Sequence, residues 1–200
     1  MAAAEFQLQP FGATGAQGVG GLGIDGIPGA SIPGASLEIG GTVERHGDLL
    51  ELDIRVAAPA REGPGAIVWP RSDQPPQRHD GLWRHTCLEM FLAHPDDEGY
   101  WEFNLAPNGH WNVYQLEGYR RGLRPDPHYT SLPFNISQQG GGIALVLRCP
   151  LPEPLAQRQP LQLAITAVVE HRAGTTSYWA LHHGGVEADF HRRDGFQLVL

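Results

Sequence analysis

TCLEMFLAHPDDEGYWEFNL, residues 86–105, contains the clearest strand pattern in the chain. Apolar side chains recur at every second position in both halves: Leu88, Met90, Leu92, Trp101, Phe103 and Leu105. The positions between them include Glu89, Glu102 and Asn104. A period of two is typical of a strand that buries one face. Because the short turn HPDDEG joins the halves, we expect antiparallel neighbours that bring these polar side chains to one face of one sheet.

The same alternation predicts short strands throughout the rest of the chain. Clusters of Gly, Pro, Asn and Asp separate them, and the one candidate helix, LPEPLAQRQPLQ, contains three prolines and can be only a turn or two long. This pattern predicts a single all-β domain over residues 1–200, an antiparallel β-sandwich of the jelly-roll or immunoglobulin-like kind with about ten strands. The predicted strands lie near residues 49–56, 66–69, 86–92, 100–105, 111–116, 134–137, 143–149, 161–170, 176–181 and 196–200.

Residues 12–41 differ from the rest of the chain in composition. They contain 11 glycines in 30 positions and almost no charge. The glycines follow no collagen period, and GVGGLG is not preceded by a predicted strand as a dinucleotide-binding loop requires. We therefore expect a flexible Gly-rich insertion.

Composition and charge narrow the classes of partner. The 14 basic residues, all Arg, stand against 22 acidic ones, giving a formal net charge of −8 that disfavours nucleic acid. No apolar run is long enough for a membrane span, and MAAAEFQLQP has no secretory signal pattern. With two cysteines the chain is expected to be cytoplasmic. The oligomeric state does not follow from the sequence.

Three motifs together resemble a known family. They are LWRHTCLEMF at 82–91, YWEFNLAPNGHWNVYQLEGYR at 100–120 and YWALHHGGVEADFHRRDGFQL at 178–198, with a weaker echo in LQPFGATG near the start. Over roughly residues 43–200 the chain resembles bacterial DOMON-like proteins, which are related to carbohydrate-binding module family 9. The resemblance implies a β-sandwich that binds a ligand, a sugar or haem, on one sheet.

The resemblance also implies roles for particular residues. Trp83 and Glu89 match the six-residue spacing of a Trp that stacks on sugar and a Glu that accepts hydroxyl hydrogen bonds. Asn104 occupies the position of an Arg in the sugar modules, and Phe190, or His191 beside it, that of a second Trp.

These residue types suit a sugar on chemical grounds as well. A pyranose stacks an apolar face on aromatic rings, and its hydroxyls bond to acids and amides. We predict non-catalytic binding of a small polar ligand, with Trp83 and Glu89 projecting together from one strand wall toward solvent. In this hypothesis Glu89 and Asn104 hydrogen-bond to the ligand, and four further residues support or close the site: Tyr100, Glu102, Phe190 and His191. The alternative interpretation is structural, with Glu89 and Asn104 a satisfied buried pair.

Catalysis is a second interpretation. Glu89 and Glu102 have the residue type and placement for the acid and base of a glycan hydrolase. Cys87 with His85 is a further candidate for a nucleophile and its base. Residues two apart on a strand point the same way, but their side chains diverge from a shared substrate, and Cys is commonly a small buried hydrophobe.

No metal or cofactor is predicted. His182, His183, Asp189 and His191 fall within ten residues, but adjacent histidines on a strand point opposite ways, and no metal-site spacing such as HExxH occurs. Haem, the other DOMON ligand, would need Met90 to leave the apolar row, and no CxxCH motif is present. A third class of function is a protein-binding scaffold that docks through residues 12–41.

Overall fold

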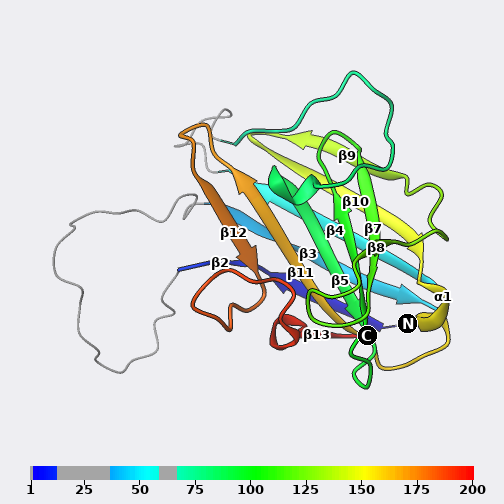
Figure 1. Ribbon diagram of the computed structural model, residues 1–200. Coiled ribbons are helices and arrows are strands. Elements are labelled where there is room, and N and C mark those ends of the chain that lie inside the picture. The colour runs from blue at the N-terminus through cyan, green and yellow to red at the C-terminus, as the bar shows by residue number, and fades with distance from the viewer. Residues whose placement is uncertain (1, 13–36, 59–66) are drawn as a thin grey trace, which may run out of the picture.

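The protein is an antiparallel β-sandwich, seen in a computed structural model that describes residues 2–12, 37–58 and 67–200 (Figure 1). Within these residues thirteen strands form two sheets, one of five strands and one of eight. Three of the strands are only two residues long, so about ten form the body of the sandwich. The predicted fold class is confirmed.

The five-stranded sheet has the order β1-β3-β4-β10-β9. All its pairings are antiparallel, and β3 and β4 form a hairpin through the tight turn at Gly47, whose φ is +68°. Its strands are β1 (Ala2–Gln7), β3 (Glu38–His46), β4 (Leu49–Ala57), β9 (Phe134–Gln139) and β10 (Gly142–Pro150).

The eight-stranded sheet has the order β2-β12-β11-β5-β6-β7-β8, and β13 pairs with β11 off this path. The sequence-adjacent strands β5, β6 and β7 lie side by side at its centre, as the short turns between them require. Its strands are β2 (Gln9–Pro10), β5 (Cys87–Ala93), β6 (Tyr100–Leu105), β7 (Trp111–Leu116), β8 (Arg124–Pro125), β11 (Gln162–Glu170), β12 (Thr176–Ala180) and β13 (Leu198–Val199).

Three short helices lie outside the sheets. They are η1 (Leu82–Arg84) before β5, α1 (Glu153–Ala156) after β10, and η2 (Arg193–Gly195) before β13. The single turn of α1 falls inside the proline-rich segment, as predicted.

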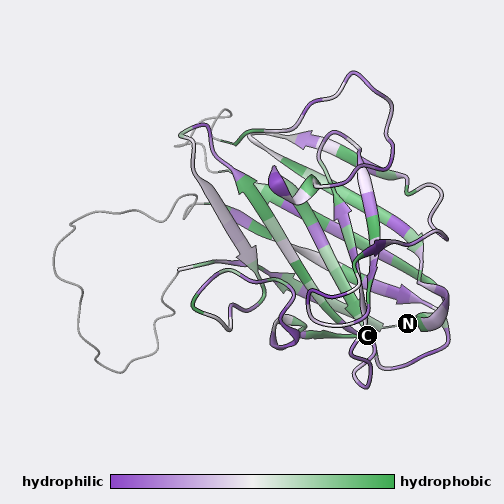
Figure 2. Cartoon of the chain, viewed as in Figure 1, coloured by the Kyte–Doolittle hydropathy of each residue, from purple (hydrophilic) through white to green (hydrophobic). Residues whose placement is uncertain are grey.

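The main core fills the space between the two sheets. Leu88, Met90 and Phe103 point into it from the eight-stranded sheet, while Leu52 and Ile54 do so from the five-stranded sheet. Figure 2 shows the alternation along these strands, with hydrophobic and hydrophilic residues following one another. The period of two in the sequence thus corresponds to one face buried in this core.

A second, smaller core lies on the outer face of the eight-stranded sheet. Phe91, Tyr100 and Tyr114 project there from the three central strands and pack with Phe196 of the C-terminal segment. That segment, drawn in red, loops over one end of the sheet in Figure 1. The central strands are therefore covered on both faces, which is why every residue of β5 and β6 is buried.

The structure corrects two sequence predictions. The expected loop 12–41 mostly lies outside the described residues, but its end belongs to β3, which starts at Glu38. Gly40 and Gly41 fit a strand here because neighbouring backbone comes close: a Cβ on Gly41 would meet the Asp53 carbonyl oxygen at 1.8 Å. The strand predicted near 66–69 is reduced, among its described residues, to one bridge between Ile67 and His171.

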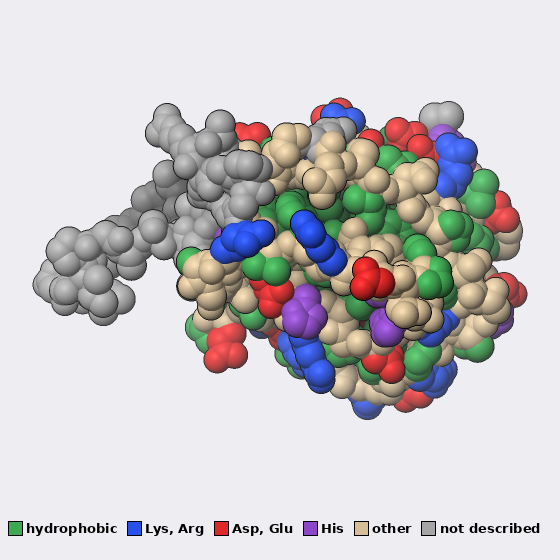
Figure 3. All heavy atoms as spheres, turned by 90° about the horizontal axis from the view of Figure 1, so that it is seen from above, with side chains coloured by type: hydrophobic (Ala, Val, Ile, Leu, Met, Phe, Trp, Pro, Cys, Tyr) green, Lys and Arg blue, Asp and Glu red, His purple; other side chains and the backbone are tan. Residues whose placement is uncertain are grey.

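Within the described residues, no helix has the length and apolar character to cross a membrane. On the face that Figure 3 shows, acidic, basic and hydrophobic side chains are interspersed.

Candidate functional site

Two carboxylates lie side by side on the outer face of the eight-stranded sheet. Glu89 of β5 pairs directly across the strands with Asn104 of β6, and Glu102 is two residues before Asn104 on the same face. Glu89 is 2% exposed and Glu102 is 3% exposed. The face shared by these three side chains, predicted from alternation, is confirmed.

Each carboxylate is only half satisfied. Glu89 Oε2 accepts a hydrogen bond of 3.1 Å from the Thr166 hydroxyl of β11, and Glu102 Oε1 accepts one of 2.7 Å from Asn104 Nδ2. The second oxygens, Glu89 Oε1 and Glu102 Oε2, have no hydrogen-bond partner among the described residues. Buried polar atoms are nearly always bonded, so two orphaned oxygens in one place call for a functional explanation.

Burial makes the charged forms of this pair costly. Desolvation, together with the charge of Glu102, raises the pKa of Glu89 to about 8. Desolvation also raises the pKa of Glu102, although the bond from Asn104 and the charge of Arg120 oppose it. At neutral pH the pair therefore retains a proton, as expected for two like charges in a water-poor site.

Other titratable groups surround the pair on every side. Burial raises the pKa of Tyr100 to about 12, raises those of Tyr114 and Cys87, and lowers that of His191 to about 4. All four are therefore uncharged near neutral pH. The charged groups of the same surroundings are Arg84, Arg120, Asp80 and Asp189.

Asn104 lies behind the carboxylates. It is fully buried, its amide donates to Glu102, and its Oδ1 accepts from Cys87 Sγ at 3.7 Å. With both ends of its amide engaged inside the protein, Asn104 orients Glu102, and the direct ligand contact predicted for it does not fit this position. Tyr100 likewise supports the wall, because its hydroxyl lies 2.8 Å from His191 Nδ1.

Trp83 reaches the same place from a different element than expected. It belongs to η1, not to the strand of Glu89, because Gly81 with φ +74° turns the chain before β5 begins at Cys87. Its ring meets Tyr114 edge-on, with centroids 5.7 Å apart. The loop is tied to β7 by Asp80, whose Oδ1 accepts bonds of 2.7 Å from the Tyr114 hydroxyl and 2.9 Å from Asn112. The prediction that Trp83 and Glu89 project from one strand wall toward solvent is thus wrong, because Trp83 comes from η1 and Glu89 is only 2% exposed. Both residues nevertheless line one pocket.

The C-terminal segment forms the opposite wall. Phe190 packs against Tyr178 of β12 with ring centroids 6.2 Å apart, and His191 packs against Phe91 at 5.4 Å. Asp189 fixes the segment, since its Oδ1 accepts a 2.8 Å bond from Arg120 and a 3.1 Å bond from the His191 amide. Phe190 and His191 line the same pocket as Trp83.

Several lining residues were not singled out from the sequence, and two of them matter for the chemistry of the site. Arg120 has a φ of +52° and lines the pocket, with its guanidinium held by Asp189. Tyr178 also lines it, because its neighbour Trp179 occupies the core while Tyr178 is 41% exposed. Strict alternation along TSYWA, with Ser177 and Trp179 facing inward, was the signal that would have placed Tyr178 correctly.

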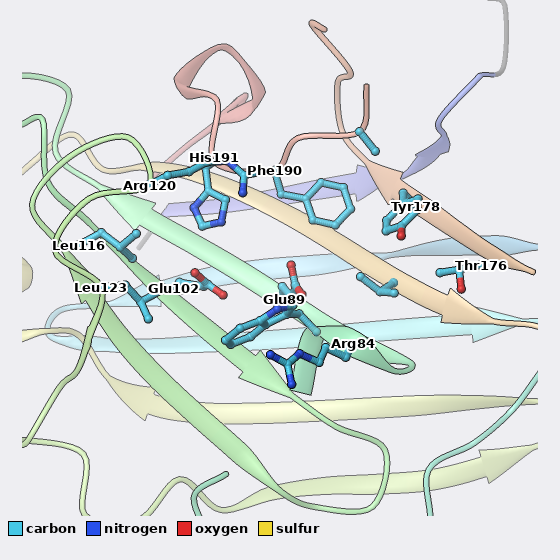
Figure 4. A pocket seen from close by; sticks show the side chains of 13 residues that line it. Arg84, Glu89, Glu102, Leu116, Arg120, Leu123, Thr176, Tyr178, Phe190 and His191 are labelled. Atoms are coloured by element: carbon cyan, nitrogen blue, oxygen red, sulfur yellow. The ribbon is translucent and has the colours of Figure 1, made fainter. Parts of the chain in front are cut away.

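These walls enclose a cavity of about 500 Å³ with the carboxylate pair at its floor. Figure 4 shows Glu89 and Glu102 pointing upward from the sheet, with Phe190 and His191 above them and Tyr178 at one side. A cavity of this size accommodates a small ligand. It is lined by Trp83, Arg84, Glu89, Glu102, Leu116, Arg120, Leu123, Val168, Thr176, Tyr178, Ala188, Phe190 and His191.

The other candidate constellations do not assemble. In the described part of the chain no three His, Cys, Asp or Glu side chains come together as metal ligands. His183 contacts the Gln9 carbonyl oxygen, and Met90 is buried in the core between the sheets. His85 approaches Glu170 at the surface while Cys87 is buried, so the two do not form a catalytic pair.

Comparison with solved structures identifies the same sandwich elsewhere. A candidate carbohydrate-binding protein from Bacteroides uniformis ATCC 8492 matches with a TM-score of 0.58 and 13% identity, over 80% of this chain and 76% of that one. A carbohydrate-binding module of family 9 from Caldicellulosiruptor kristjanssonii, solved with cellotriose and with glucose, matches at 8% identity over 75% of this chain and 68% and 69% of those chains, with TM-scores of 0.47. No family model and no curated protein matches the sequence. The first similarity shows the fold.

Proposed function

We propose that the protein binds a small carbohydrate in this cavity without transforming it. The observation that carries the proposal is the pair of orphaned carboxylate oxygens, Glu89 Oε1 and Glu102 Oε2, at the floor of a cavity walled by aromatic rings. Carboxylate oxygens accept hydroxyl hydrogen bonds, and Trp83 and Phe190 offer apolar ring faces to a pyranose. The shared sandwich and the description of the Bacteroides protein support this proposal, as does the resemblance to DOMON-like proteins.

The arrangement of the carboxylates favours binding over hydrolysis. In a glycoside hydrolase the two carboxyl groups flank the scissile bond from different sides. Glu89 and Glu102 rise together from adjacent strands of one sheet and so meet the same side of a ligand (Figure 4).

Isothermal titration calorimetry with a panel of mono- and disaccharides tests the proposal. We expect one or more sugars to bind the wild type, and Trp83→Ala to weaken that binding at least tenfold because the stacking surface is lost. Trp69→Ala is the matched control, since Trp69 lies outside this cavity and is also partly buried. Its affinity should equal that of the wild type.

Two results would contradict the proposal. One is the absence of heat from every sugar with folded protein, and the other is equal weakening by the Trp83 and Trp69 substitutions. Release of reducing ends from oligosaccharides by the wild type, abolished by Glu102→Gln, would instead establish the hydrolase.

A further inference from the structure

The floor of the cavity has two carboxyl groups, Glu89 and Glu102, and a neutral sugar brings no charge to compensate them. An ionised carboxylate only accepts hydrogen bonds, and two ionised carboxylates side by side repel each other, so in the absence of a cation the pair retains a proton. Among the described residues no ion pair involves Glu89 or Glu102. A ligand that brings a positive charge would meet both oxygens at once.

The two cations that line the cavity are used or placed elsewhere. Arg120 donates to Asp189 Oδ1 at 2.8 Å, so a carboxylate outside the pair neutralises it. Arg84 is an exposed residue of η1, at the opening of the cavity rather than at its floor. Arg120 acts on Glu102 only through its field, and neither arginine forms an ion pair with Glu89 or Glu102.

The walls above the floor also suit a cation. Trp83, Tyr178 and Phe190 come from three different elements, η1, β12 and the C-terminal segment, and all line the cavity. Aromatic faces attract ammonium groups through their quadrupole, most strongly where water is excluded. An acidic floor beneath aromatic walls is an arrangement that recognises an ammonium group on a small organic body.

We infer that the ligand is an amino sugar in its protonated form, its ammonium group held between Glu89 and Glu102 and its ring against the aromatic walls. This inference rests on the proposed carbohydrate function and names the class of sugar. When the ammonium group binds, the pair releases its retained proton to solvent, and ammonium N–H groups donate to Glu89 Oε1 and Glu102 Oε2. These bonds complete the hydrogen bonding that Thr166 and Asn104 begin.

Calorimetry with D-glucosamine, D-glucose and N-acetyl-D-glucosamine at pH 7 tests the inference. The three sugars share a pyranose ring, but only glucosamine carries an ammonium group at pH 7. We expect glucosamine to bind at least tenfold more tightly than either neutral sugar. In the double variant Glu89→Gln/Glu102→Gln the preference should fall to less than threefold, because the amides keep the shape of the floor but remove its charge.

Glu51→Gln is the matched control. It removes one carboxylate that pairs with Arg148 on the five-stranded sheet and should keep the full preference for glucosamine. Near-ultraviolet circular dichroism of each variant establishes that the fold is retained, and the single variants Glu89→Gln and Glu102→Gln replace the double variant if it does not fold.

The outcomes separate the two proposals. Equal affinity for glucosamine and glucose would overturn the inference and leave the carbohydrate function standing. Binding of none of the three sugars would overturn the inference, and absence of binding across the whole panel of mono- and disaccharides would overturn the carbohydrate function as well. A preference for glucosamine that survives in the amide variants would also overturn the inference, because the charge would then act from outside the floor.

Discussion

The two faces of β5 and β6 contrast sharply although they come from the same 13 residues. On the inner face, Leu88, Met90 and Phe103 are sealed between the sheets. On the outer face, Glu89 and Glu102 lie beneath a cavity with one oxygen each unbonded. Both faces are buried, but of the two only the outer face has buried side-chain oxygens without a hydrogen-bond partner.

The contrast separates stability from recognition. Apolar packing between the sheets has no directional requirement and is complete without any ligand. The outer face leaves buried polar groups unsatisfied, which costs free energy in the unliganded protein. We therefore expect substitutions on the inner face to destabilise the protein and substitutions of the outer carboxylates to stabilise it.

The largest effect is expected for Phe103→Ala. Phe103 is fully buried between the sheets and packs edge-on against Tyr129, with centroids 5.3 Å apart. Removing a buried phenyl ring leaves a cavity that costs about 3–5 kcal/mol. Urea unfolding followed by tryptophan fluorescence measures this loss.

Phe190→Ala is the comparison on the outer face. Phe190 is only partly buried and packs against the smaller core. Its free energy of unfolding should fall by less than half as much. Equal losses of unfolding free energy for Phe103→Ala and Phe190→Ala would show that the two faces contribute equally to stability, contrary to this prediction.

A smaller effect, of predictable sign, is expected from pH. The pKa of Glu89 is about 8 in the folded protein and near its ordinary value of 4.5 in the unfolded chain, so the folded state binds more protons between these values. The contribution of Glu89 to the free energy of unfolding should therefore fall as the pH rises from about 5 to 8. Below about pH 6.5 the lowered pKa of His191, about 4 in the folded protein, acts in the opposite sense, because the unfolded chain then binds the extra proton. The fall in stability should therefore be clearest between about pH 6.5 and 8, where Tyr100, Tyr114 and Cys87 stay largely protonated in both states.

Glu89→Gln isolates this contribution. The amide cannot titrate and removes the repulsion with Glu102, so the variant should lose less stability than the wild type over the same pH range. Urea midpoints at pH 5, 6, 7 and 8 give the comparison. If the variant and the wild type lost stability equally as the pH rises, the pKa of Glu89 would not be raised by folding, and the prediction would be wrong.

The smallest effect is expected where Asp189 of the C-terminal segment accepts hydrogen bonds from the turn between β7 and β8. Asp189→Asn weakens the bonds from Arg120 and Tyr119, but Arg120 is half exposed and such pairs contribute about 0–1 kcal/mol. The urea midpoint should shift only slightly, while sugar affinity falls because Phe190 and His191 are less firmly held. A variant with unchanged affinity would show that the wall is held by the small core alone.

The sandwich was predictable because strand alternation is a local property. LLELDIRV at 49–56 and TCLEMF at 86–91 show their inner faces residue by residue, and both strands appear where expected. The first strand, Ala2–Gln7, was missed because AAAEFQ is small and shows little alternation; pairing with β3 makes it a strand. Such tertiary pairing is invisible in a short sequence window.

The site was predictable in part for a similar reason. Glu89, Glu102 and Asn104 belong to paired strands, so their common face followed from register. Arg120 was missed because a turn with a left-handed residue has a weak sequence signal, whereas the alternation along TSYWA that places Tyr178 is present in the sequence. The origin of Trp83 in η1 depended on the left-handed Gly81, which alternation cannot detect.

Both cysteines of the chain are buried, and burial raises the pKa of Cys149 to about 12 and that of Cys87 as well. Neither thiol should react readily with maleimide reagents. Val186, 97% exposed and two residues from Ala188 at the cavity, could be changed to Cys and would then be the preferred site for a fluorescent dye. Because the native thiols would take up little dye, the fluorescence of a dye at position 186 could be used to follow ligand binding in the cavity.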